Sequence, residues 1–198
     1  ALAAMFLADV RFSVRESTYT LYNKTIKNYL VPYLGGCLLT KLDCAAVNGL
    51  ARWLLGNGGK KGTGLSPKTV TDALCVAKEI FAFGKQNGYA CPNLDGIRYP
   101  QKKARTTEIF AEGNRREMER SLLSAEDGVS LGVLLTLFTG LRLGELCGLR
   151  WEDVAFGRKV LSVRRTVERI ADLSPARGAK PKLVVSEPRA ESSVPRIP

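Results

Sequence analysis

Apolar residues recur at helical spacing through residues 1–92, which predicts four amphipathic helices packed around one core. The four stripes are, in chain order, Leu2, Met5, Phe6 and Val10; Tyr19, Tyr22, Ile26, Tyr29 and Leu30; Val47, Leu50, Ala51 and Leu54; and Val70, Leu74, Ala77, Ile80 and Phe81.

Start and stop signals separate these helices from one another. Ser17 is the expected cap of the second helix, and Pro32 is its expected end. Asp43 is the expected cap of the third helix. Ser66 followed by Pro67 predicts the start of the fourth, because proline suits the first helical position.

The pattern changes after this block. Residues 93–107 are polar and basic, which is typical of a linker between domains. Beyond it, Ile109, Phe110, Met118 and Leu122 predict one helix, and residues 129–138 predict a second, buried helix.

Short apolar runs at 160–163 and 182–185 predict two strands, with a loop over 171–181 between them. The sequence therefore predicts a mainly α fold with a small antiparallel sheet. It divides into a helical domain (1–92), a basic linker (93–107) and a mixed α+β domain (108–198).

Charge narrows the range of partners. There are 30 Lys and Arg against 19 Asp and Glu, a formal net charge of +11. A chain this basic binds polyanions, with DNA or RNA the first candidate and an anionic membrane surface the rival. No apolar run is long enough to span a bilayer.

Residue types also limit the chemistry. The five cysteines form no C-x-x-C pair and there is no histidine, which excludes a Ser-His or Cys-His nucleophile system in these residues. No metal site and no cofactor are expected. Scattered, reduced thiols fit a cytoplasmic protein.

The run from Thr136 to Val154 carries the clearest chemical signal. An apolar helix ends at Gly140, Arg142 lies at the turn, and Glu145 follows three positions later. A guanidinium binds phosphate oxygens bidentately, and a carboxylate one helical turn away can hold it in place. The pattern favours a phosphoryl-transfer site in which Arg142 neutralises the developing charge.

This run resembles the first-arginine motif of the tyrosine recombinase (phage integrase) family. Two earlier segments, Pro32-Tyr33-Leu34-Gly35 and Leu65-Ser66-Pro67-Lys68-Thr69-Val70, look like parts of that family's core-binding domain. The end of the run, Trp151-Glu152-Asp153-Val154, looks like the entry to its sheet. The resemblance implies a SAM-like core-binding domain, followed by the front part of an α+β catalytic domain whose strands enter a three-stranded sheet.

The resemblance also implies an activity. In that family a tyrosine attacks a DNA phosphodiester and forms a 3′-phosphotyrosyl link, without metal or nucleotide. Arg142 would clamp the scissile phosphate and Glu145 would support the site. The parent protein would act on double-stranded DNA, at attachment or inverted-repeat sites, as a tetrameric synapse in the bacterial cytoplasm.

The closing segment departs from the family pattern. Integrases often carry a Pro-Lys-Thr-Lys-Ser-Ser run whose first lysine is the general acid. Here the run is Pro188-Arg189-Ala190-Glu191-Ser192-Ser193. Arginine is a poor proton donor. Either the protein tolerates Arg189, or the step is weakened, or Lys182 substitutes; a basic hairpin that only binds phosphate is equally compatible.

The family's remaining catalytic residues, a His-x-x-Arg box and the tyrosine nucleophile, lie downstream of that run. The sequence ends at Pro198, and all six tyrosines precede Arg142. The expectation is that this chain binds duplex DNA and does not cleave it alone.

Basic side chains of the first block and linker are the candidates for DNA phosphate contacts, which add affinity and salt dependence. They are Lys60, Lys61, Lys68, Lys78, Arg98, Lys102, Lys103 and Arg105. Ordinary solvated surface is the alternative for each. The glycine-rich loop around Lys60 lacks phosphate-loop spacing, so a turn is predicted there.

Two other functions stay open. Residues 139–154 also resemble a helix-turn-helix, which would make the chain a transcriptional regulator. The recognition helix would then be 144–150, which offers few polar side chains to read base edges. The other is a truncated integrase that competes with an intact one for DNA.

Overall fold

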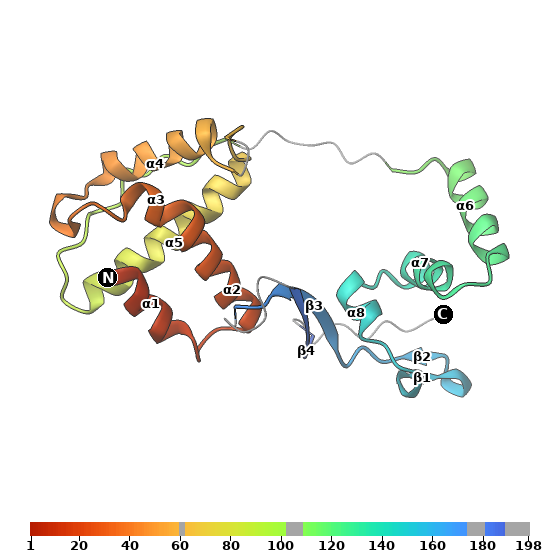
Figure 1. Cartoon of the computed structure of the whole chain (residues 1–198). Coiled ribbons are helices and arrows are strands. Elements are labelled where there is room, and N and C mark those ends of the chain that lie inside the picture. Colours follow the sequence, from red (N-terminus) through yellow and green to blue (C-terminus); the bar gives the residue numbers. More distant parts are fainter. Residues whose placement is uncertain (60–61, 102–108, 174–180, 189–198) are drawn as a thin grey trace. The chain divides into compact units, whose positions relative to one another are not determined.

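The computed structural model describes residues 1–59, 62–101, 109–173 and 181–188. The chain divides into two compact units, Ala1–Arg105 and Thr106–Pro198 (Figure 1). The fold is mostly helical with two small antiparallel sheets, which confirms the predicted class. Within the described ranges, no helix combines the length and apolar character needed to cross a membrane.

The first unit is all helical. Its elements are α1 (Leu2–Val10), α2 (Glu16–Thr25), the π-helix η1 (Ile26–Leu30), α3 (Val31–Leu34), the 3-10 helix η2 (Leu39–Lys41), α4 (Cys44–Asn57) and α5 (Pro67–Gln86). The long helix α5 lies against α1, α2 and α4 (Figure 1). Leu50, Leu54 and Leu74 are fully buried at the centre, so the predicted stripes form one core.

Two predicted helix starts are confirmed by their caps. Asp43 Oδ1 accepts the backbone N–H of Ala46 at 2.8 Å. Ser66 Oγ accepts the N–H of Thr69 at 3.2 Å, and Pro67 occupies the first helical position. Each cap satisfies a backbone donor that has no partner inside its helix.

The second predicted helix is wrong at both ends. It begins at Glu16, so Ser17 lies inside the first turn and does not cap it. Pro32 does not end it, because the chain continues through η1 into α3. The Val31 N–H bonds to the Ile26 carbonyl, the spacing of a π turn. This wider turn accommodates a proline that has no N–H to contribute.

After α5 the chain returns along the first unit. Leu94 and Ile97 pack against its core. The side-chain amide of Asn48, in α4, forms two hydrogen bonds with this segment. Nδ2 donates to the Gly96 carbonyl at 3.1 Å, and Oδ1 accepts the Arg98 N–H at 2.9 Å. The front of the predicted linker therefore lies against α4, and its remainder, 102–107, falls outside the described residues.

The second unit mixes helices and short strands. Its elements are α6 (Glu112–Ser124), α7 (Gly128–Thr139), α8 (Leu143–Cys147), η3 (Trp151–Asp153), β1 (Val154–Ala155), η4 (Phe156–Arg158), β2 (Val160–Leu161), β3 (Thr166–Ala171) and β4 (Pro181–Ser186). Strand β1 pairs with β2, and β3 pairs with β4, both antiparallel. Leu141, Leu161 and Val163 form its small buried core.

Several details of the second unit differ from the prediction. Ile109 and Phe110 precede α6 and are exposed. Helix α7 is apolar but mostly accessible, because only Ser130 and Leu134 are buried. The described strands form two separate pairs, not one three-stranded sheet. Strand β3 was not predicted, since its charged residues interrupt the apolar pattern.

Candidate functional site

A glycine turn places the start of α8. Gly140 ends α7 in the left-handed region, with φ 69° and ψ 18°, and its N–H bonds to the Thr136 carbonyl at 2.9 Å. Glycine adopts this conformation without a Cβ penalty. The next residue, Leu141, is buried in the small core. The turn therefore anchors the chain immediately before Arg142.

Arg142 and Glu145 form the pair that the sequence predicted. Glu145 Oε2 accepts the backbone N–H of Arg142 at 3.0 Å, and Oε1 accepts Nη1 of its guanidinium at 2.9 Å. The Glu145 side chain is 7% exposed, and that of Arg142 is 72% exposed. A buried carboxylate thus caps the helix and orients an exposed cation.

This geometry leaves N–H groups of the Arg142 guanidinium available to a ligand. Among the residues that the structure describes, the Arg142 guanidinium bonds only to Glu145. Its other N–H groups can therefore bind an anion in the bidentate manner typical of arginine and phosphate. The described ranges contain no group of His, Cys, Asp or Glu side chains placed to hold a metal ion.

Two glycines let α8 lie directly on β3. A Cβ at Gly144 would meet Thr166 Oγ1 at 2.6 Å and the Val167 carbonyl oxygen at 2.9 Å. A Cβ at Gly148 would meet the Arg165 carbonyl oxygen at 2.7 Å. The helix that follows Arg142 is therefore positioned by close contact with β3 and with Arg165, the residue before it.

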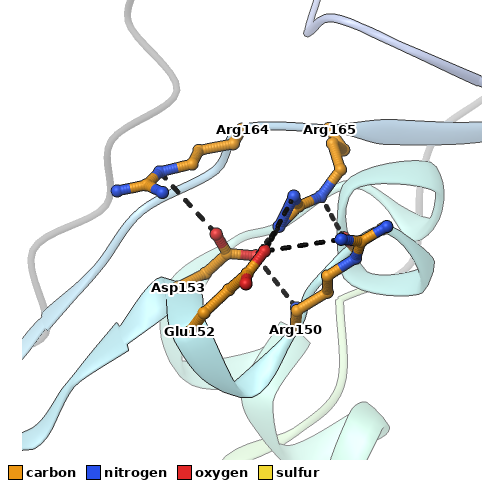
Figure 2. A network of polar contacts seen from close by, with 6 residues as sticks. Arg150, Glu152, Asp153, Arg164 and Arg165 are labelled. Atoms are coloured by element: carbon orange, nitrogen blue, oxygen red, sulfur yellow. Dashed lines mark hydrogen bonds and ion pairs between the residues drawn. The ribbon is translucent and has the colours of Figure 1, made fainter.

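A network of charged side chains links the residues after α8 to the two arginines that precede β3 (Figure 2). Asp153 Oδ2 accepts the Arg150 N–H at 2.9 Å and Arg165 Nη2 at 2.6 Å. Arg164 Nε lies 3.7 Å from the other oxygen, Oδ1. Arg165 Nε also donates to the Gly148 carbonyl at 3.4 Å. Arg165 thus connects the end of α8 to η3.

Asp153 is charged although it is buried, with 1% of its side chain exposed. Burial acts most strongly on its pKa and raises it. The Arg150 N–H, the hydrogen bond and charge of Arg165, and the charge of Arg164 together outweigh burial, so the pKa lies below its usual value. Glu152 adds a more exposed carboxylate that binds Arg150 and Arg165.

The structure describes only some of the remaining predicted site residues. Lys182 lies on β4 opposite Ile170. Lys68 pairs with Asp72 at 2.7 Å, and Lys78 and Arg98 are exposed. Outside the described residues lie Arg189, Lys60, Lys61, Lys102, Lys103 and Arg105. Their site roles stay predictions.

Sequence reasoning missed Asp153, Arg165 and the packing role of Gly144 and Gly148. The signal was weak, because Asp153 and Arg165 are twelve positions apart and meet only after the chain passes through two short strands. The adjacent cations Arg164 and Arg165 were the one hint in the sequence.

Known proteins resemble this chain in sequence and in fold. Residues 1–48 match the model of the phage integrase N-terminal SAM-like domain. A tyrosine recombinase XerC-like protein of Caldanaerobacter subterraneus subsp. tengcongensis is 25% identical over 199 residues, 96% of this chain and 48% of that protein. The chain therefore spans about half the length of this curated relative.

Two solved structures share the fold. The Tn1549 transposon integrase in complex with transposon right end DNA has a TM-score of 0.75 at 19% identity, covering 100% of this chain and 60% of that one. The lambda integrase dimer bound to a COC′ core site has a TM-score of 0.64 at 14% identity, covering 92% and 47%. The resemblance is confirmed: this chain is similar in sequence to tyrosine recombinases and phage integrases, and it shares the fold of solved integrase structures.

Proposed function

We propose that this chain supplies the DNA-binding unit and the arginine-bearing front half of the catalytic site of a tyrosine-type site-specific recombinase. The observation that carries the proposal is the buried Glu145 carboxylate, which orients the exposed Arg142 guanidinium at the start of α8. The similarity to DNA-bound integrases supports it.

In this proposal Arg142 binds the scissile phosphate of duplex DNA. Charge builds on the non-bridging oxygens when the phosphate is attacked, and a fixed guanidinium stabilises it without reorganising. Glu145 holds the backbone and one nitrogen of Arg142, and the other N–H groups contact the phosphate. Lys182 or Arg189 acts toward the leaving 5′ oxygen.

The nucleophile is not expected among these residues. The sequence has no histidine, and its six tyrosines all precede Arg142. We expect residues 1–198 to bind duplex DNA without cleaving it. The complete recombinase would cut and rejoin DNA as a tetramer at attachment or inverted-repeat sites in the bacterial cytoplasm.

The helix-turn-helix alternative gains no support from the second unit. Helix α8 has five residues, Leu143–Cys147. Its glycine face packs against β3, since a Cβ at Gly144 would meet Thr166 and Val167. A recognition helix needs a free face to enter the major groove. A DNA-binding competitor remains compatible with the proposal, because it needs the same binding surface.

Salt-dependent binding tests the first half of the proposal. The purified chain is titrated with a labelled duplex over a range of NaCl concentrations. The logarithm of the association constant should fall linearly with the logarithm of salt, by about 0.9 for each phosphate neutralised. No binding at about 50 mM salt, or binding unaffected by salt, would contradict a DNA-binding function.

A further inference from the structure

A hollow of about 430 Å³ lies in the first unit, between α4 and the segment that returns after α5. Arg52 enters its lining from α4, and Arg98 and Tyr99 enter from the returning segment. A volume of this size is typical of small-ligand sites. No role was predicted for Arg52, and Arg98 was predicted as one of eight candidate contacts to DNA phosphates.

The walls of this hollow are held in place before any ligand arrives. Asn48, itself part of the lining, bonds through both ends of its amide to Gly96 and Arg98. The backbone that carries Arg98 is therefore fixed against the helix that carries Arg52. A site built in advance loses less conformational freedom when it binds.

Within the described part of the chain, neither arginine has a counter-charge. Arg52 is the only charged side chain in α4, so it has no acidic partner one helical turn away. Among the described residues, no carboxylate forms an ion pair with Arg52 or Arg98, and none lines the hollow. Two arginines thus line one concave surface, and its other described lining residues carry no charge.

We propose that this hollow is a phosphate-binding site, in which Arg52 and Arg98 together hold one backbone phosphate of duplex DNA. The inference rests on the DNA-binding function proposed above. Two guanidinium forks can contact separate oxygens of one phosphate group. The hydroxyl of Tyr99 can add a further hydrogen bond, and Leu55 and Pro100 give an apolar wall against which a deoxyribose fits.

The test compares salt dependence in matched variants of the whole chain. Arg52→Ala and Arg98→Ala should each weaken duplex binding about fivefold to tenfold at moderate salt. If both arginines hold one phosphate, the double variant should lower the salt slope by about 0.9. Contacts to two separate phosphates would lower it by about 1.8. Arg52→Lys should keep the slope but bind less tightly, because lysine cannot form the bidentate contact.

Arg15→Ala combined with Lys27→Ala is the matched control, because it removes two exposed cations of the same unit away from the hollow. Equal losses of affinity and slope in the two double variants would show general surface charge and overturn the proposal. All variants are first checked for an unchanged melting temperature, which is expected because the replaced side chains are exposed.

A second measurement locates the ligand and identifies its source. Backbone amide signals of Gly96 and Arg98 should shift in NMR spectra when duplex DNA is added to the wild-type chain. If inorganic phosphate or a free nucleotide shifts these signals and duplex DNA does not, the ligand is a small anion and the proposal is wrong. If the wild-type chain binds no DNA at all, the proposed function fails with it.

Discussion

At the scale of single residues, the candidate site depends on one buried carboxylate with two tasks. Glu145 accepts the backbone N–H of Arg142, the cap residue of α8, and also holds the Arg142 guanidinium. Removing it would leave a backbone donor without its partner and an arginine without a fixed orientation.

We expect Glu145→Ala to destabilise the second unit by about 1–3 kcal/mol, because a buried charge-assisted hydrogen bond is lost. Glu145→Gln should cost less, since an amide oxygen can still accept the Arg142 N–H. Hydrogen exchange of the α8 amides measures both effects. Equal protection in the wild type and the alanine variant would contradict the role of Glu145 as a cap.

Asp153 should make the folding stability of the second unit depend on pH. Its folded pKa is lower than the unfolded value of about 3.9, so its contribution is complete above that value. The contribution is lost as pH falls from there through the folded pKa. We expect Asp153→Asn to be less stable than the wild type at pH 7, by about 1–3 kcal/mol.

The same difference should nearly disappear in acid below the folded pKa, where the wild-type carboxyl is also neutral. Denaturant unfolding of both proteins at pH 7 and in acid provides the comparison. A difference of equal size under both conditions would show that the charge of Asp153 does not stabilise the fold.

The residues that the sequence revealed are those close together along the chain. Arg142 and Glu145 are three positions apart, so helical spacing alone places them together. Arg52 and Arg98 line one hollow because Asn48 binds the returning segment against α4. That contact depends on packing, which no local pattern encodes.

At the scale of elements, the position of Arg142 depends on how closely α8 approaches β3. Gly144 lies against the Thr166 hydroxyl and the Val167 carbonyl, and Gly148 lies against the Arg165 carbonyl. Arg165 strengthens the contact by donating to the Gly148 carbonyl. Small residues permit this distance, and any added atom must move the strand or the helix.

We expect Gly144→Ala to destabilise the second unit by about 1–3 kcal/mol through overpacking. Gly113→Ala is the control, because Gly113 is also the second residue of its helix, α6, and its added Cβ meets nothing within 4 Å. That variant should gain up to about 1 kcal/mol from helix propensity. If both variants were stabilised in thermal melts, the close contact would not exist.

Helices with strong apolar stripes and caps were predictable, as α4 and α5 show. The elements that failed follow weaker rules. The helical path continues through a π turn and past Pro32. Strand β3 has a glutamate and an arginine at its centre. Pairing with β4 stabilises β3, and pairing partners lie outside any local window.

At the scale of the whole molecule, the two units differ in how completely they bury apolar surface. The first has a core that includes Val47, Leu50 and Leu74. The second buries few residues and exposes several large ones, among them Val129, Phe138 and Trp151. Exposed apolar surface of this extent lowers stability and promotes association.

We therefore expect residues 1–101, expressed alone, to unfold in one cooperative thermal transition. Residues 109–198 alone should bind the dye ANS and melt without a sharp transition, because their small core cannot offset the entropy of ordering the chain. Calorimetry and dye fluorescence measure these outcomes. A cooperative second unit that binds no dye would show that its core is larger than the described residues indicate.

We expect above all that this chain binds duplex DNA but does not break it. The most direct test incubates the purified chain with a nicked suicide duplex and analyses the products on native and denaturing gels. We predict a salt-sensitive complex on the native gel and no protein–DNA adduct under denaturing conditions. A covalent adduct at any of the six tyrosines, or no complex at low salt, would contradict the account.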